Sequence, residues 1–143
     1  KELREGRVEK KYLAVVKGQW LHKEKLITLN LKKNQLRSGA REVIVRPDGK
    51  ESITRFKRLK GNKSLSLLEC KLITGRTHQI RVHTSHEGHP VIGDKKYGDS
   101  DTNNLYRKKG IKRMLLHAIS INFPAINLSC SAKEPDIFTE IIN

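Results

Sequence analysis

Long apolar runs are absent from this sequence. No stretch approaches the roughly 20 consecutive apolar residues that a membrane-spanning helix needs, which argues against an integral helical membrane protein. The first residues, Lys1 to Arg4, include no Met and no apolar segment typical of a signal peptide. We therefore expect a cytoplasmic protein, and the abrupt start suggests a trimmed or cleaved chain.

Cysteine is also scarce. Only Cys70 and Cys130 occur in 143 residues, too few for a disulfide scaffold, and reduced thiols suit a cytoplasmic protein. Cys70 lies in an apolar run that offers no exposed, electropositive surroundings in which a thiolate would form. We therefore do not expect Cys70 to act as a nucleophile.

Acidic residues are few relative to basic ones. Fifteen Asp and Glu accompany 30 Lys and Arg, which gives a formal net charge of +15. A compact chain with this excess repels itself, so a polyanionic partner is the simplest reason for it. Nucleic acid fits best because basic residues are spread from Lys1 to Lys133. The alternative is a solvated basic surface that only maintains solubility.

The apolar pattern predicts one α+β domain over residues 1–143, with a mixed, mainly antiparallel sheet and few helices. In the longest predicted strand the apolar phase changes after Leu67, which indicates a bulge or a change of packing. Strands are predicted at Tyr12–Val16, Leu26–Leu31, Glu42–Arg46, Ser52–Leu59, Ser64–Thr74 and Arg113–Phe123. Helices are predicted at Lys1–Lys11, as the end of a helix that begins upstream, at Thr77–Glu87 before Gly88, and at Asp136–Ile142. Loops are predicted at Lys32–Ala40, Pro47–Gly49 and Pro90–Tyr97, and a mobile polar segment at Ser100–Asn104.

The densest group of polar side chains lies at Thr74–His83, where a predicted strand turns at Gly75 and enters a helix. The start of a helix offers free backbone N–H groups to an anion. Arg76 adds a planar guanidinium that can hold a carboxylate at two points. The alternative is an exposed basic helix that begins at a Thr77 cap.

Two further segments contain residue types that are found in binding sites. In His86-Glu87-Gly88-His89 the histidines are three residues apart and Gly88 ends the helix, so the spacing disfavours a metal site. The loop Gly93–Gly98 carries cations and one aromatic ring between two glycines. It suits contact with a phosphate and a base, although an ordinary surface turn would look the same.

Four stretches together resemble the RluA family of pseudouridine synthases, and within it the branch that acts on large-subunit (23S) ribosomal RNA. They are Lys11–Trp20, Thr74–His83, Gly88–Gly98 and the Leu-Leu-His-Ala of Leu115–Ala118. The resemblance implies that family's fold, with this chain as the C-terminal part of one catalytic domain that is a monomer in the intact enzyme.

The same resemblance implies a reaction. Family members isomerise uridine to pseudouridine without a metal or an organic cofactor, and their nucleophile is an Asp in a His-Arg-Leu-Asp motif. That motif does not occur in this sequence, and in the family it precedes the Tyr-containing strand, upstream of the position of Lys1. We therefore expect the isolated chain to bind RNA but to be inactive.

The resemblance also assigns roles to individual residues. Tyr12 resembles the tyrosine that packs against the target uracil and assists removal of its C5 proton. Arg76 resembles the arginine that pairs with the nucleophilic Asp, and Leu116, or its neighbour Leu115, resembles an apolar wall of the uracil pocket. The predicted RNA-contact residues are His78, Gln79, Arg81, Lys95 and Tyr97.

Two other functions remain open at this level. The chain could be a basic RNA-binding or assembly module that has no nucleophile of its own. It could also be a metalloprotein that uses its six histidines, although their spacing disfavours this.

Overall fold

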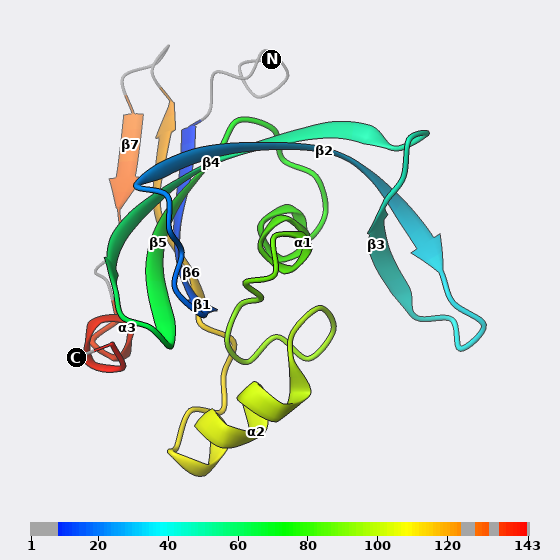
Figure 1. Ribbon diagram of the computed structural model, residues 1–143. Coiled ribbons are helices and arrows are strands. Elements are labelled where there is room, and N and C mark those ends of the chain that lie inside the picture. The colour runs from blue at the N-terminus through cyan, green and yellow to red at the C-terminus, as the bar shows by residue number, and fades with distance from the viewer. Residues whose placement is uncertain (1–8, 124–127, 132–134, 143) are drawn as a thin grey trace.

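A computed structural model describes residues 9–123, 128–131 and 135–142. Its core is a seven-stranded sheet in which neighbouring strands pair antiparallel, in the order β3-β2-β4-β5-β1-β6-β7 (Figure 1). The strands are β1 (Glu9–Lys17), β2 (Glu24–Gln35), β3 (Arg41–Val45), β4 (Lys50–Gly61), β5 (Leu65–Leu72), β6 (Leu116–Phe123) and β7 (Leu128–Ser131). The helices are α1 (Gln79–His86), α2 (Ser100–Lys108) and α3 (Ile137–Glu140).

Strand β1, in the interior of the sheet, is apolar along most of its length because both faces of the sheet are covered there. Ala14 and Val16 belong to a core cluster with Ile80 of α1, whereas Leu13 and Val15 belong to a second cluster with Phe138 of α3. Helices α1 and α3 therefore cover opposite faces of the sheet, and α1 lies in the hollow of its curved side (Figure 1).

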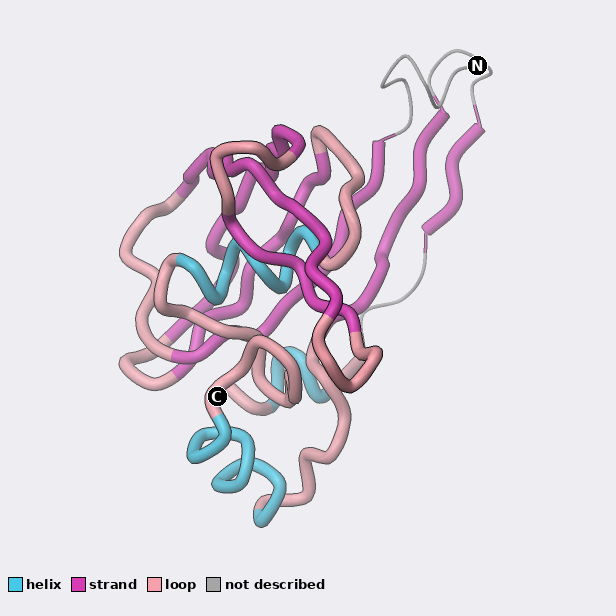
Figure 2. The backbone as a smooth tube through the Cα atoms, turned by 90° about the vertical axis from the view of Figure 1, so that its right-hand side faces the viewer, coloured by secondary structure: helices cyan, strands magenta, loops and turns pink. Residues whose placement is uncertain are grey.

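The hairpin of β2 and β3 bends over α1. Leu31 and Val43 of the hairpin pack against Val82 of the helix. Figure 2, in which the β3 side of the molecule faces the viewer, shows strands passing in front of α1. The hairpin and the sheet thus enclose the helix, so the segment before α1 lies between the hairpin and the rest of the sheet.

All six predicted strands are present, several with longer bounds. The structure corrects three predictions. Glu9–Lys11 belong to β1 and not to a helix, and residues 1–8 lie outside the described part of the chain. Lys32–Gln35 continue β2, because they pair with β3. Ser100–Asn104, predicted to be a mobile polar segment, starts α2.

The change of apolar phase in β5 reflects packing. Leu67 faces the α3 cluster and Leu68 faces the α1 cluster, so both are buried. The register between β5 and β1 is continuous along the described pairs. The irregularity lies opposite, in β4 between Arg58 and Lys60. Strand β7 was not predicted. No helix in the described ranges is long and apolar enough to cross a membrane.

Candidate functional site

Tyr12 and Leu116 lie on neighbouring strands at the α1 face of the sheet. Tyr12 of β1 pairs in register with Ala118 of β6, and Leu116 pairs with Ala14. Both Tyr12 and Leu116 are half-buried and pack against the α1 cluster, together with Leu72. The predicted aromatic partner and the predicted apolar wall of a uracil pocket are therefore brought together. Leu115, the alternative, is fully buried in the other cluster.

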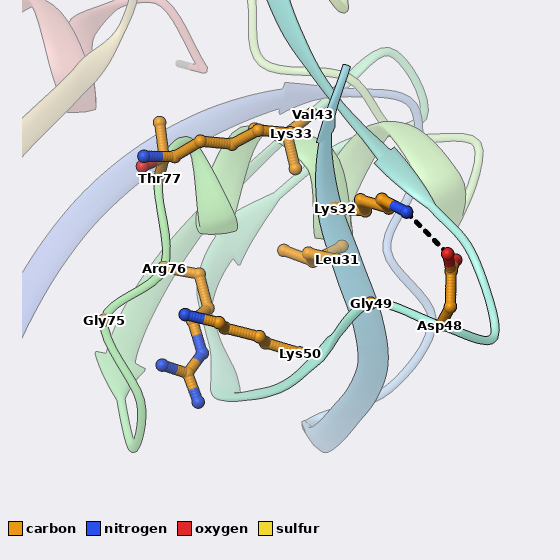
Figure 3. A pocket seen from close by; sticks show the side chains of 10 residues that line it. All are labelled: Leu31, Lys32, Lys33, Val43, Asp48, Gly49, Lys50, Gly75, Arg76 and Thr77. Carbon is orange, nitrogen blue, oxygen red and sulfur yellow. Dashed lines mark hydrogen bonds and ion pairs between the residues drawn. The ribbon is translucent and has the colours of Figure 1, made fainter.

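Arg76 lies in the segment between β5 and α1, and its side chain is exposed. Its Nε donates a hydrogen bond to the Glu51 carbonyl oxygen at 3.0 Å, which directs the guanidinium toward the start of β4. Arg76 lines a cavity of about 500 Å³ that it shares with the β2–β3 hairpin, and neither Tyr12 nor Leu116 lines this cavity (Figure 3). The structure thus brings Tyr12 and Leu116 together but places Arg76 in a separate cavity.

Gln79 fixes the turn that carries Arg76. The side chain is buried, and its Oε1 accepts hydrogen bonds from the Thr74 hydroxyl at 2.8 Å and from the Arg76 backbone N–H at 2.9 Å. Its Nε2 donates to the Ile53 carbonyl at 2.9 Å and to the Thr54 hydroxyl at 2.8 Å. An amide side chain can donate two hydrogen bonds and accept two, so Gln79 is fully engaged. The predicted RNA contact stays untested, and the geometry is that of a positioning residue.

His78 precedes α1 with a left-handed backbone, φ 55°, a conformation that costs energy for a non-glycine residue and is concentrated at functional sites. Its Nδ1 lies 2.8 Å from the Tyr97 hydroxyl. Burial lowers the pKa of His78, and the nearby Arg81 and Lys96 lower it further, so the ring is neutral at neutral pH. Half-buried His78 and Tyr97 remain predicted RNA contacts.

Arg81 forms a two-point ion pair with Asp94. Its Nε and one terminal nitrogen each donate to a carboxylate oxygen at 2.9 Å, and the guanidinium lies 5.0 Å from the centre of the Tyr97 ring. Burial alone would raise the pKa of Asp94, but hydrogen bonds from Arg81 and from the backbone N–H groups of Tyr97 and Lys96 lower it below its usual range. Asp94 was not among the predicted site residues.

The loop 93–98 is compact because of its glycines. A Cβ at Gly93, which has φ 85°, would lie 2.3 Å from the Arg113 carbonyl oxygen, and one at Gly98 would lie 2.1 Å from the Asp94 carbonyl oxygen. Lys95 is exposed at this turn, as an RNA contact requires.

Glu87, His89 and Cys70 have surroundings that favour structural roles over metal binding or nucleophilic chemistry. The Glu87 carboxylate pairs with Lys25 at 2.5 Å, and His89 donates from Nδ1 to the Lys17 carbonyl. Across the described residues, no three His, Cys, Asp or Glu side chains gather as metal ligands would. Burial raises the pKa of the Cys70 thiol, which disfavours a thiolate.

A family model described as RNA pseudouridylate synthase matches residues 1–86. Ribosomal large subunit pseudouridine synthase C of Haemophilus influenzae is 47% identical over 122 residues, which cover 85% of this chain and 38% of that protein. Its namesake in Escherichia coli (strain K12) is 44% identical over 124 residues, with coverages of 85% and 39%. The chain therefore spans less than half the length of these relatives.

Solved structures show the same fold. The human RNA Pseudouridylate Synthase Domain Containing 1 superposes with a TM-score of 0.79 at 30% identity and covers 99% of this chain and 60% of that one. The human RNA Pseudouridylate Synthase Domain Containing 4 gives a TM-score of 0.74 at 23% identity, over 96% of this chain and 62% of that one, which supports the fold alone.

Proposed function

The chain belongs to the RNA pseudouridylate synthase family, and from this premise we propose that residues 1–143 are the C-terminal part of one catalytic domain that converts uridine to pseudouridine in 23S ribosomal RNA. The observation that carries the proposal is the conjunction of family membership with the placement of Tyr12 beside Leu116 on adjacent strands. The intact enzyme acts as a monomer.

In this proposal the target uracil packs between the Tyr12 ring and the Leu116 side chain. The bond between N1 of the base and C1′ of the ribose breaks, the base rotates, and a bond from C5 to C1′ forms. The C5 proton then leaves while N1 is protonated, and the Tyr12 hydroxyl assists its removal. Extrusion of the uridine from a stacked strand costs energy, which contacts with the backbone of the RNA offset.

Arg76 has an electrostatic role in the same proposal. A guanidinium beside a carboxylate favours its charged form and orients the attacking oxygen. The Asp that Arg76 would orient belongs to a His-Arg-Leu-Asp motif, which is not among the 143 residues. The chain as it stands therefore binds RNA without forming pseudouridine.

The test uses an intact protein that contains this chain together with the motif. Tyr12→Phe and Arg76→Ala should each lower the rate of pseudouridine formation by about 100-fold or more, the scale of a lost proton-transfer or orienting group, with a much smaller loss of RNA affinity. Tyr106→Phe, a buried tyrosine of α2, is the matched control. Affinity that falls in parallel with the rate would contradict the catalytic assignments.

A binding module is the second candidate, and the net charge of +15 favours it. It predicts RNA binding that weakens steeply with salt and an intact protein without isomerase activity. Pseudouridine formed by the wild-type intact protein would exclude this alternative.

A further inference from the structure

We propose that the hollow between the β2–β3 hairpin and residues 75–78 binds the sugar-phosphate backbone of the RNA strand next to the target uridine. We call this hollow the hairpin trough, and its assignment to RNA rests on the proposed function. It comprises a cavity of about 500 Å³ and an adjoining one of about 310 Å³. The two cavities share Lys33, Val43 and Thr77, so they form one continuous depression.

The trough has a strongly cationic lining. Two carboxylates, Asp48 and Glu42, line it, and Asp48 is engaged by Lys32 at 2.5 Å and by Arg46 at 3.1 Å. Figure 3 shows Lys32 turned away toward Asp48, whereas Lys33 reaches across the cavity toward Thr77. The cationic side chains along the two cavities are Lys32, Lys33, Arg41, Lys50, Arg76 and Lys96.

Two lysines on the opposite face of the sheet have carboxylate partners. There, Lys71 lies 3.4 Å from Glu9 and Lys11 lies 4.0 Å from Glu69, as cross-strand pairs on a solvated face do. Within the described residues, neither Lys33 nor Lys50 lies within ion-pair distance of a carboxylate. Repulsion between neighbouring cations in a hollow is relieved when an anion binds, which a general solubilising surface does not require.

The chemistry of the lining indicates phosphates more than bases. Proteins that bind RNA strands through the bases stack these bases on aromatic rings. Of the residues along the trough only His78 has a ring. The remaining groups are ammonium and guanidinium ends, the Thr77 hydroxyl and an apolar floor of Leu31 and Val43, which suit phosphate and ribose contacts.

The walls of the trough are fixed before RNA arrives. The Val43 backbone N–H donates to the Tyr97 hydroxyl at 2.8 Å, and the Lys96 ammonium donates to the Arg41 carbonyl, so the hairpin is attached to loop 93–98. Arg76, the proposed catalytic arginine, lines the same trough, so an RNA strand bound there lies next to it. A fixed wall of cations lowers the ordering that binding requires.

The test measures affinity of the intact protein for a short single-stranded RNA with one central uridine, over a range of salt concentrations. Lys33→Gln/Lys50→Gln should weaken binding more than about tenfold near 0.1 M salt and lower the slope of log affinity against log salt by about 1.4, since each phosphate contact to a single strand contributes about 0.7. The matched control, Lys57→Gln/Lys63→Gln, removes the same charge from exposed positions outside the trough and should leave both quantities near the wild type.

A second arm replaces single phosphates by uncharged methylphosphonates. One replacement beside the uridine should weaken binding to the wild type but not to the lysine variant, which identifies the contacted phosphate. Equal losses of RNA affinity in the trough variant and the control variant would overturn the proposal. A trough variant whose affinity still falls with every methylphosphonate replacement would overturn it as well. Pseudouridine formation is measured separately, so a wild type that binds RNA but does not isomerise it refutes the proposed function and leaves the contact result to stand.

Discussion

The Tyr97 hydroxyl accepts a hydrogen bond from the Val43 backbone N–H at 2.8 Å. Its own proton is then available to His78, whose Nδ1 lies 2.8 Å away. One hydroxyl group therefore joins β3, the residue that precedes α1, and loop 93–98. Because Val43 also packs beside Leu31 and Val82, the polar contact and the small apolar cluster hold the hairpin in the same position over α1.

Tyr97→Phe should loosen the hairpin without unfolding the sheet. It removes the acceptor of the Val43 amide, a loss of about 1 kcal/mol, so exchange of that amide with solvent should quicken about fivefold to tenfold. Amide hydrogen exchange measures this residue by residue, and amides of β1 serve as the internal control. Unchanged exchange at Val43 would show that the apolar contacts alone hold the hairpin. RNA affinity should fall as well, because Val43 lines the hairpin trough.

Arg81→Ala should destabilise the fold strongly, because it leaves the buried Asp94 carboxylate without its cation. Removal of one partner from a buried pair costs about 3–5 kcal/mol. Urea unfolding measures the loss, and Arg81→Ala/Asp94→Ala should recover part of it. The exposed pair of Lys17 and Asp99, at 2.9 Å, is the matched control, and Lys17→Ala should cost less than about 1 kcal/mol. A double variant less stable than Arg81→Ala would contradict the orphaned-charge explanation.

Gln79→Leu should lower the free energy of unfolding by about 2–4 kcal/mol. The substitution keeps a similar volume but leaves partners of the amide without a hydrogen bond, among them the buried Thr54 hydroxyl and the Arg76 backbone N–H. Gln19→Leu at an exposed position is the control and should change stability by less than about 0.5 kcal/mol. The Arg76 amide should also exchange faster, a readout specific to the turn. A stable variant with a protected Arg76 amide would exclude the positioning role.

Strands were predictable where local pattern and tertiary packing agree. Tyr12–Val16 reads as a buried strand because both of its faces meet a core cluster. Helix α2 was missed because Ser100–Asn104 is polar and typical of a turn. What makes the segment helical is distant: Tyr106 is buried in a core cluster, and Asn103 bonds the Gly93 N–H and the Asp94 carbonyl. Neither contact is visible in a local window of sequence.

Only those residues of the candidate site that belong to family motifs were predictable from the sequence. Tyr12, Arg76 and Leu116 follow from the resemblance, and the first and last are adjacent across β1 and β6. The role of Gln79 depends on partners in β4 that lie 25 and 26 residues away in sequence. The hairpin trough likewise depends on the register that brings Lys50 opposite Leu31 and on the bend of the hairpin over α1. Spacing along one strand contains neither piece of information.

A buried histidine gives the fold a specific response to acid. His83 is fully buried, and burial lowers its pKa to about 4 from an ordinary value of 6.5; His86 lowers the pKa further and Glu87 opposes this. The Ser52 hydroxyl donates to the Leu29 carbonyl at 2.7 Å, so its contact with His83 Nε2, also 2.7 Å, uses a proton on that nitrogen. The second ring nitrogen, Nδ1, has no hydrogen-bond partner among the described residues, so a proton added there would be buried without an acceptor.

Stability should therefore fall in mild acid. Below pH 6.5 the unfolded chain binds a proton at His83, whereas the folded chain does not bind it until about pH 4. The contribution of neutral His83 to the free energy of unfolding is therefore complete above pH 6.5. It is lost as the pH falls to about 4, by up to about 3 kcal/mol. Urea unfolding at pH 7.5, 6, 5 and about 4 measures the slope. His83→Gln should flatten it, whatever its stability at pH 7.5, whereas His22→Gln, at an exposed position, should not. The same slope in both variants would assign the acid response to other groups, His78 first, because its pKa is also lowered by burial.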